Sequence, residues 1–400
     1  MSIKKKGGKI LNYQRVSLEE VKNPQRFNDD KSFLDDAIKY ATDKIFSVMK
    51  DFVHKFPSSS SENLIYKPFP DIYETDWVAG FWTGMLWTSY ELTGNELFRA
   101  VAETQFDDYQ EKYDDFTCFW HHDIGFTYIP SIVAQYKITG VKKAKELGVK
   151  AARALANRFS EKAGIIQVRN QSAQGEFIVD CSMNIPLLFW ASHVTGERQF
   201  FVKALSHIYK VAECTINDNA SVKQHGLIDE VTGEVLDYKK PNQGGAVCWA
   251  RGQVWIMYGL ALAYRYAKDE RILEMAKRVS NYFLNRLPSD LICNWDLVLT
   301  ADDDPRDSSN APIAACALLE ISKHLSENDV HKKMYEDAAI SIMRNLSEQY
   351  TTKGRESNGL LMHGVYVKNS LGDDECCMWG DYFFMEGLLR LKNENWNIYW

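Results

Sequence analysis

Two aspartates occupy similar places in the sequence, each just before a segment that carries few charges. Asp123 follows the pair His121 and His122, and Asp180 follows a run of three apolar residues. Burial beside apolar groups raises the pKa of a carboxyl group, and a second carboxylate nearby raises it further. The two aspartates are therefore a candidate pair for general acid and base chemistry near neutral pH. The alternative for each is a structural role as a helix N-cap.

Aromatic side chains that could hold a sugar ring occur in two further stretches. Trp77 and Phe81 lie in a glycine-containing stretch, and Trp249 and Trp255 flank Arg251. Aromatic faces stack on sugar rings, although packing in the protein core is the commoner use of a tryptophan. A buried arginine needs an anionic partner, either an internal carboxylate or one on a ligand. Leaving its charge unpaired would cost about 3 to 5 kcal/mol.

The adjacent histidines do not have the spacing of a metal site. Two ligands on one face of a helix lie three or four residues apart, and His121 and His122 are neighbours. No Cys-x-x-Cys pair occurs, so we expect neither a metal nor another cofactor. The cysteines are scattered along the chain and are expected to be reduced thiols. They are Cys118, Cys181, Cys214, Cys248, Cys293, Cys316, Cys376 and Cys377.

Hydrophobic periodicity predicts helices almost throughout the chain, so the expected fold class is all-α. Six amphipathic segments are typical of helices on the outside of a fold. They lie near residues 32–53, 96–112, 143–160, 199–215, 270–287 and 331–349. Six segments with fewer charges alternate with them and are predicted to be buried. They lie near residues 80–93, 125–138, 181–196, 249–268, 310–325 and 379–394.

Glycines and loop lengths order these segments into hairpins. Three low-charge segments end in Thr-Gly, at Gly94, Gly140 and Gly196, where glycine suits a left-handed C-cap. Connections after the low-charge helices are short and those after the amphipathic helices are long, so the long loops gather at one end. Six hairpins predict an (α/α)6 barrel with its site at that end, and an open helical solenoid is the alternative. We expect a single domain over residues 1–400, with residues 1–30 as an N-terminal extension.

The composition narrows the range of partners. Hydrophobic residues make up 45% of the 400 residues and aromatic residues 13%, which is enough for a large core. The net charge of -7 offers no positive field to nucleic acid or to an anionic membrane surface, so neither is an expected partner. No apolar stretch approaches the roughly 18 residues of a membrane helix, and no secretory apolar run follows the basic start. We expect a cytoplasmic protein that is a monomer or a homodimer.

Seven motifs, taken in chain order, resemble those of the unsaturated glucuronyl hydrolases, classified as glycoside hydrolase family 88. This family removes the unsaturated uronic acid that polysaccharide lyases leave behind, and its members fold as (α/α)6 barrels without a metal. The resemblance covers nearly the whole chain. The motifs are Trp77 to Gly84, His121-His122-Asp123 with Gly125-Phe126, Asp180-Cys181 with Asn184, Trp249 to Trp255, Pro305-Arg306-Asp307, His363-Gly364-Val365-Tyr366 and Trp379-Gly380-Asp381-Tyr382.

The resemblance implies a role for each candidate residue. Asp180 would protonate C4 of the C4=C5 double bond and then help a water molecule add at C5, with Asp123 as the assisting carboxylate. The hydrated product would open and expel the neighbouring sugar. The implied substrate is a di- or oligosaccharide that lyases release from glycosaminoglycans, with the unsaturated uronic acid at its non-reducing end. The implied substrate-binding residues are Trp77, Phe81, His122, His225, Gln243, Trp249, Arg251, Trp255 and Ser370.

Two stretches depart from the family pattern. The segment from Gln243 to Trp249 is shorter than in many members. Members that accept sulfated disaccharides carry Ser-x-x-Ser-x-Lys after Gly-Val-Tyr, and here only Ser370 matches, with Lys368 available to compensate from another position. We therefore predict a weak preference for the 6-sulfated chondroitin disaccharide and better use of unsulfated or differently modified substrates.

Three other functions remain open from the sequence. The related unsaturated rhamnogalacturonyl hydrolases share the barrel and the acid but act on pectin fragments. Sugar isomerases and epimerases of related barrels use histidine bases, so activity would survive the change of Asp180 to Asn and would depend on His225. A non-catalytic carbohydrate-binding protein would use the loop aspartates only as helix caps.

Overall fold

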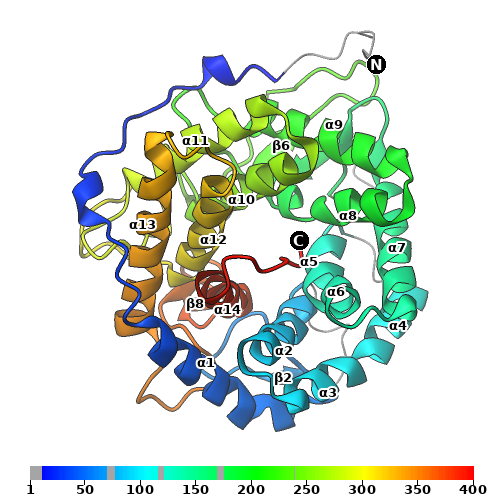
Figure 1. Cartoon of the computed structure of the whole chain (residues 1–400). Coiled ribbons are helices and arrows are strands. Elements are labelled where there is room, and N and C mark those ends of the chain that lie inside the picture. The colour runs from blue at the N-terminus through cyan, green and yellow to red at the C-terminus, as the bar shows by residue number, and fades with distance from the viewer. Residues whose placement is uncertain (1–10, 70–76, 116–120, 169–174, 238) are drawn as a thin grey trace.

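The helices lie in two concentric rings (Figure 1). The computed structural model describes residues 11–69, 77–115, 121–168, 175–237 and 239–400. The inner ring consists of α2 (Ala79–Thr93), α5 (Ile124–Tyr128), a π-helical turn (Ile129–Val133) that leads into α6 (Ala134–Thr139), α8 (Pro186–Thr195), α10 (Ala250–Ala267), α12 (Ala311–Ser322) and α14 (Met378–Lys392). The outer ring consists of α1 (Leu34–Val48), α3 (Glu96–Thr104), α4 (Phe106–Asp114), α7 (Lys142–Ala156), α9 (Arg198–Thr215), α11 (Glu270–Leu284) and α13 (Val330–Asn345).

The inner ring is closed. Each inner helix contacts the next, from α2 through α5, α8, α10 and α12 to α14, and α14 packs back against α2. An open solenoid would leave its first and last inner helices apart. The closure therefore confirms the predicted all-α fold, an (α/α)6 barrel of six helical hairpins.

The inner helices, which carry few charges, are buried on nearly all sides, whereas the charged outer helices are buried on one face. All twelve residues of α12 are buried in the inner ring. In the outer helix α9, the buried side chains recur three or four residues apart, at Phe200, Ala204, Ile208 and Val211. This spacing places them on one face of the helix, which packs on the inner ring while the charged face meets water.

Three predicted glycine caps lie where the sequence places them. Gly94, Gly140 and Gly196 follow α2, α6 and α8 with φ angles of 69°, 72° and 77°. A side chain at a positive φ is strained, so glycine ends each helix at low cost and lets the chain reverse into the outer ring. Lys268 takes the same left-handed conformation after α10 without being a glycine.

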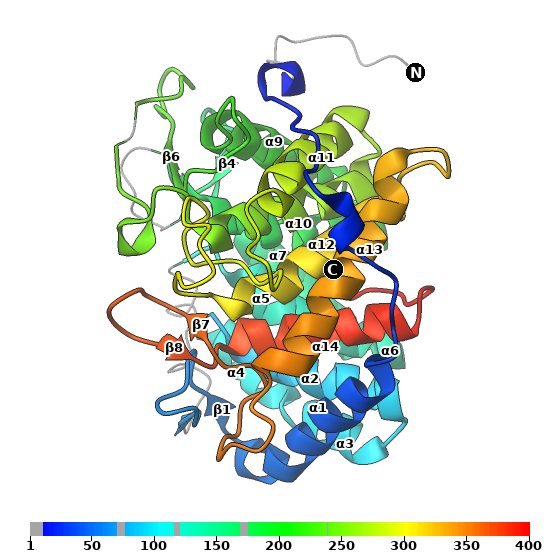
Figure 2. The ribbon, with the colours of Figure 1, turned by 90° about the vertical axis from the view of Figure 1, so that its left-hand side faces the viewer.

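Short strands brace the long loops at one end of the barrel (Figure 2). Three hairpins pair β1 (Phe56–Pro57) with β2 (Pro68–Phe69), β3 (Phe159–Ser160) with β4 (Ile165–Ile166), and β7 (Gly364–Val365) with β8 (Asp373–Glu375). A fourth pair joins two different loops, because β5 (Glu176–Ile178) pairs with β6 (His225–Leu227). Sequence periodicity does not signal strands this short, and the pairing of two separate loops is a tertiary feature.

The described part of the N-terminal extension runs across the outer ring (Figure 1). Arg15 donates a hydrogen bond to the carbonyl of Ile216 just after α9 (2.7 Å), and Arg26 donates to the carbonyl of Leu284 at the end of α11 (2.8 Å). The last carbonyls of a helix lack partners within the helix, and a cation there also favours the helix dipole. The first ten residues lie outside the described part of the chain.

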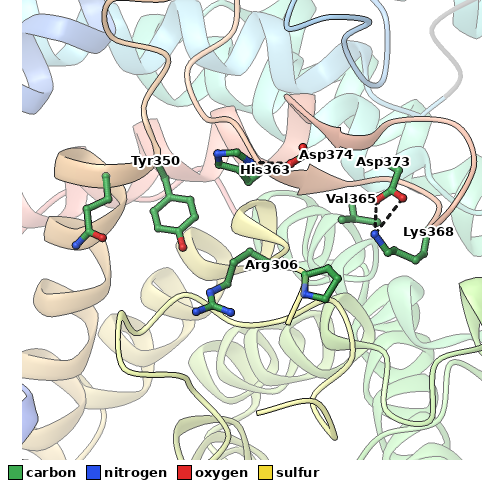
Figure 3. Close-up of a pocket in the computed structure, with 9 residues that line it drawn as sticks. Arg306, Tyr350, His363, Val365, Lys368, Asp373 and Asp374 are labelled. Atoms are coloured by element: carbon green, nitrogen blue, oxygen red, sulfur yellow. Dashed lines mark hydrogen bonds and ion pairs between the residues drawn. The ribbon is translucent and has the colours of Figure 1, made fainter. Parts of the chain in front are cut away.

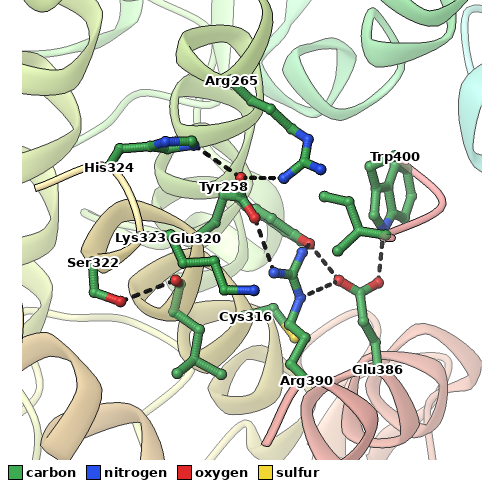
Figure 4. A network of polar contacts seen from close by, with 12 residues as sticks. Tyr258, Arg265, Cys316, Glu320, Ser322, Lys323, His324, Glu386, Arg390 and Trp400 are labelled. Carbon is green, nitrogen blue, oxygen red and sulfur yellow. Dashed lines mark hydrogen bonds and ion pairs between the residues drawn. The ribbon is translucent and has the colours of Figure 1, made fainter. Parts of the chain in front are cut away.

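A buried polar network lies near the barrel axis, away from the long loops (Figure 4). Arg390 donates to Glu320 (3.0 Å) and to Glu386 (2.9 Å), and Glu386 also accepts from the indole of Trp400 (2.7 Å). The hydroxyl of Tyr258 lies between Arg390 and Glu386 and bonds to both. The charges in this network are thus paired by opposite charge and by hydrogen bonds, as burial requires.

The last two features of the described ranges concern membrane spans and disulfide bonds. None of the helices in the described ranges combines the length and apolarity that a membrane span needs. The seven cysteines within those ranges are free thiols, whereas Cys118 lies outside them.

Candidate active site

Asp180 lies at the long-loop end of the barrel, in a 3₁₀ turn (Val179–Met183) that follows β5 directly. Its side chain is half-buried, and its Oδ1 atom has no accessible surface and no hydrogen-bond partner among the described residues. Burial and the neighbouring charge of Asp123 raise the pKa of Asp180 to about 7, against an opposing effect of Arg251. Near neutral pH the carboxyl group can therefore hold a proton and give it up.

Asp123 has the opposite electrostatic setting. Its carboxylate lies 3.2 Å from the ring of His122 and 3.2 Å from that of His121, and it accepts a hydrogen bond from the Asn184 amide (3.1 Å). Burial opposes ionisation, but these three neighbours outweigh it and lower the pKa of Asp123 to about 2. Two adjacent carboxyl groups with pKa values pushed apart form an acid and a charged partner.

Neither aspartate acts as a helix cap. Asp123 precedes α5, yet its side chain accepts no hydrogen bond from the backbone of the first turn. Asp180 lies inside its 3₁₀ turn, where its Oδ1 is unbonded. The geometry does not support the capping alternative, which would have used these oxygens locally.

Asn184 connects the segments that carry the two acids. Its amide nitrogen donates to the Asp123 side chain (3.1 Å) and to the backbone carbonyl of Asp180 (3.3 Å). Its carbonyl oxygen accepts from the N–H of Phe126 (2.8 Å). Gly125 allows this contact, because a Cβ atom there would lie 2.4 Å from the Asn184 backbone. One side chain thereby sets the spacing between the acids.

Two further predicted residues are histidines, one in contact with Asp123 and one on the strand that pairs with β5. His122 is buried against Asp123, and burial lowers its pKa. His225 begins β6 and pairs with Ile178, two residues before Asp180. Burial and the nearby Lys240 lower the pKa of His225 to about 4, so both groups favour the neutral ring at pH 7. Neutral imidazoles can both donate and accept hydrogen bonds.

Aromatic rings form a wall next to the acids. Trp77 is partly exposed and stacks on Trp379 with ring centroids 5.1 Å apart and planes 24° apart. The ring centroid of Phe126 lies 5.3 Å from that of Trp77 and 5.0 Å from that of Trp255. Phe81 is 0% exposed and Trp255 is 1% exposed, so both support the wall from within the core. Their direct contact with a sugar stays a prediction.

Arg251 is enclosed by the protein. It is 2% exposed, and its guanidinium donates to the carbonyls of Val365 (2.6 Å) and Tyr366 (2.9 Å) and to the side chain of Gln243 (2.9 Å). The carboxylate of Asp307 lies 3.7 Å away as its counter-charge. The internal pairing considered for this arginine is thus present, and it also fixes the predicted ligand residue Gln243.

Two tryptophans cover the faces of the guanidinium. Its central carbon lies 4.5 Å from the ring centroid of Trp249 and 4.6 Å from that of Trp379. Trp249 is held as the residue before α10, where Asp296 accepts hydrogen bonds from the backbone of Val247 (2.7 Å) and Cys248 (2.9 Å). The loop before α10 is therefore held by Asp296.

No cluster of three or more histidine, cysteine or acidic side chains suited to a metal occurs within the described ranges. The described residues can transfer a proton through the Asp180 carboxyl group, which lies beside the ionised Asp123, an aromatic wall and a buried cation. The profile of Glycosyl Hydrolase Family 88 matches residues 45–386. The chain belongs to this family.

Relatives of this family 88 enzyme match almost end to end. An unsaturated chondroitin disaccharide hydrolase of Streptococcus pneumoniae is 37% identical over 97% of this chain and 100% of its own length. The crystal structure of an unsaturated glucuronyl hydrolase from Streptococcus agalactiae superimposes with a TM-score of 0.92 at 36% identity, covering 96% of this chain and 99% of that one. A mutant of that enzyme complexed with dGlcA-GalNAc6S gives a TM-score of 0.85 at 35% identity, with the same coverage. The predicted family and enzyme class, a glycosidase, are confirmed.

The last predicted site residue, Ser370, is exposed on the loop between β7 and β8. Lys368 on the same loop is half-buried and donates to both carboxylate oxygens of Asp373 (2.9 and 3.0 Å). A pocket of about 500 Å³ lies between this hairpin and the loop before α12 (Figure 3). Its lining consists of Pro305, Arg306, Gln349, Tyr350, His363, Val365, Lys368, Asp373 and Asp374. Val365 also bonds to Arg251, so the pocket borders the site of this family 88 enzyme.

The sequence did not reveal how three residues of this family 88 enzyme serve its site. Asn184 bridges the acids, Trp379 stacks under Trp77, and Asp307 pairs with Arg251. All three stand in the quoted motifs, but without an assigned contact. The spacing of four residues from Asp180 to Asn184 is the one local signal, because such residues share a helical face. The other two contacts join distant parts of the chain.

Proposed function

We propose that this enzyme releases the 4,5-unsaturated uronic acid from the non-reducing end of glycosaminoglycan disaccharides, with Asp180 as catalytic acid and base and Asp123 as its charged partner. One observation carries the assignment of the acid. The half-buried Asp180, whose Oδ1 is unbonded and whose pKa is about 7, lies beside the ionised Asp123. The names of the family 88 relatives support the substrate class.

The proposed reaction is a hydration. Protonated Asp180 gives its proton to C4 of the C4=C5 double bond, and positive charge develops at C5 and the ring oxygen. A water molecule attacks C5 and returns one proton to the Asp180 carboxylate, which restores the acid. The product is a hemiketal at C5, which opens and expels the neighbouring sugar. Ionised Asp123 stabilises the positive charge and keeps Asp180 protonated before the reaction.

The remaining predicted residues would hold the sugar. Trp77 presents the exposed part of the aromatic wall, and the neutral His122 and His225 can bond to hydroxyl groups. Gln243 and Trp249 are placed by their contacts with Arg251. Phe81 and Trp255 would act from behind the wall, and Ser370 from the hairpin loop at its rim.

The proposal extends to the partners, the cellular location and the oligomeric state of the enzyme. A net charge of -7 argues against nucleic acid and anionic membranes as partners. We propose that the enzyme works in the cytoplasm as a monomer or homodimer and as a single domain over residues 1–400.

The test follows the ultraviolet absorbance of the conjugated double bond with unsulfated unsaturated chondroitin and hyaluronan disaccharides. We expect absorbance to fall with the wild type, and to fall about 10³-fold more slowly with Asp180→Asn, which cannot give the proton. Asp381→Asn is the matched control, because burial likewise raises the pKa of Asp381 to about 7 while its partners are backbone groups and Tyr66. Full activity of Asp180→Asn with loss in His225→Ala would instead indicate an epimerase. Turnover of pectin fragments alone would indicate the rhamnogalacturonyl type.

A further inference from the structure

We propose that Asp307 is a positioning residue, which holds Arg251 and Trp379 in one rigid unit and thereby fixes the substrate-binding wall. This inference rests on the proposed function, because it concerns how that site is assembled. Asp307 belongs to the motif Pro305-Arg306-Asp307, to which the proposed reaction gives no part. It lies just before a 3₁₀ turn that leads into α12 and is 1% exposed.

Asp307 makes more contacts than a cap of its own turn requires. Its Oδ1 accepts from the N–H of Ser309 (3.2 Å), which is the capping bond, and also from the Ser309 hydroxyl (2.6 Å) and the N–H of Val365 (2.9 Å). Its Oδ2 accepts from the Asn310 amide (2.8 Å) and lies 3.7 Å from the guanidinium of Arg251. Both oxygens are therefore occupied, and two of these contacts reach other elements.

The first of these connections leads to Arg251. Asp307 faces the guanidinium directly, and it also binds the N–H of Val365, whose carbonyl accepts from Arg251 (2.6 Å). Three groups thus fix one another in a triangle. Both charged side chains are almost fully buried, so Asp307 supplies the counter-charge that burial of Arg251 requires. The orientation of the guanidinium then sets that of Gln243, which bonds to it (2.9 Å).

The second connection leads to the aromatic wall. The indole N–H of Trp379 can only donate, and it donates to the Ser309 hydroxyl (2.9 Å). That hydroxyl must therefore give its own proton to Asp307 (2.6 Å). The hydrogen bonds therefore run in one direction, from Trp379 to Ser309 and from Ser309 to the Asp307 carboxylate. Trp379 in turn stacks under Trp77 and covers one face of Arg251.

Replacing Asp307 with Asn breaks this unit at a defined point. An amide has one acceptor oxygen where the carboxylate has two, so either Ser309 and Val365 or Asn310 would face an N–H₂ group. The amide also carries no charge to balance Arg251. The variant keeps the size and shape of the side chain, so its effect reports on bonding and charge.

The experiment is a double-mutant cycle on Asp307→Asn and Arg251→Gln, with kcat and KM measured on the unsulfated chondroitin disaccharide. We expect Asp307→Asn to raise KM about 10-fold with kcat within about 3-fold, and to add less than about 2-fold once Arg251 is replaced. Asp381→Asn is the matched control, a buried carboxylate at the same end of the barrel, and its effect should multiply with that of Arg251→Gln. An unchanged KM in Asp307→Asn, or full multiplication of the two losses, overturns the proposal.

Near-ultraviolet circular dichroism keeps the test independent of turnover. The stacked pair of Trp77 and Trp379 gives a signal that depends on their mutual orientation. We expect Asp307→Asn to lose part of the signal that Trp379→Phe removes, and Asp381→Asn to retain it. A wild type that turns over no unsaturated saccharide would contradict the proposed function, and the dichroism would still decide the role of Asp307. A spectrum of Asp307→Asn identical to that of the wild type contradicts the positioning role.

Discussion

Two buried clusters of charge in this barrel differ in how completely they are paired. Near the axis, Arg390 bonds to two glutamates, and the pKa of Glu320 is lowered because His324, Arg390 and Arg265 outweigh the effect of burial. At the long-loop end, Asp180 has an unbonded oxygen and a pKa raised to about 7. Both clusters contain buried carboxyl groups, in the first on inner helices and in the second just before them.

The difference separates stability from chemistry. A buried carboxylate that is paired with cations, such as Glu320, titrates far below neutral pH and holds its neighbours in place, so it cannot exchange a proton with a substrate. A carboxyl group that is desolvated and left incompletely bonded is ready to do so, at some expense to folding. Four changes test this contrast, from the largest expected effect to the smallest.

Breaking the paired cluster should have the largest effect. Arg390→Met leaves Glu386 without its cation and removes one of the partners of Glu320, so we expect the free energy of unfolding to fall by about 3 to 5 kcal/mol. Urea denaturation measures the loss. Lys392→Met on the same helix is the control, because its pair with Asp35 is exposed and should contribute less than about 1 kcal/mol. Equal losses in the two variants would contradict the contrast.

Removing the charge beside Asp180 should impair catalysis. In the wild type, activity requires protonated Asp180, so kcat/KM is expected to fall as pH rises through about 7. Asp123→Asn removes the charge that helps to raise the pKa of Asp180, so this fall should move to lower pH, with kcat reduced about 10²-fold. Rate profiles against pH measure both effects. A shift to higher pH would show that Asp123 does not act through its charge.

Ionisation of Asp180 should lower the stability of the fold as pH rises through about 7. The pKa of Asp180 is raised on folding, so its contribution to stability is present below its unfolded pKa and is lost as pH rises through about 7. Asp180→Asn does not titrate. We expect its free energy of unfolding, relative to the wild type, to increase by about 2 kcal/mol between pH 4 and pH 8, roughly half of the full effect of this pKa, because the side chain is only half-buried. A difference that stays constant with pH would mean that Asp180 is not desolvated in the native state.

A pair at the rim of the site should have the smallest effect. Lys368 is held by both oxygens of Asp373, so it is poorly placed to meet a sulfate. We expect the 6-sulfated chondroitin disaccharide to be turned over about 5-fold less efficiently than the unsulfated one, and Asp373→Asn to narrow the gap by releasing Lys368. Asp374→Asn, whose partner is His363, is the control. Faster turnover of the sulfated form by the wild type would contradict this prediction.

Local features were predictable from the sequence because their causes are local. Thr-Gly pairs mark the ends of α2, α6 and α8, and charge separates outer from inner helices. Asp123 and Asp180 stand out because each follows a loop and precedes a buried helix. The resemblance to family 88 joined these features into one fold and one reaction class.

The contacts that tune the site were not predictable in the same way. The pairing of Arg251 depends on Asp307 and Val365, which lie on loops later in the chain. The pairing of β5 with β6 joins two loops whose sequences carry no strand signal. Phe81 and Trp255 resemble ligand-stacking residues by type and position, yet packing places both behind the wall. Burial and pairing of this kind depend on the tertiary structure.

The closing contact between α14 and α2 also sets an order in time. A ribosome completes Asp123 and Asp180 well before Trp379, the residue on whose ring Trp77 stacks. Until α14 has emerged and docked, the growing chain holds its acids beside an unfinished wall. We therefore expect interrupted synthesis to yield fragments that contain both acids but lack the Trp379 ring that completes the wall.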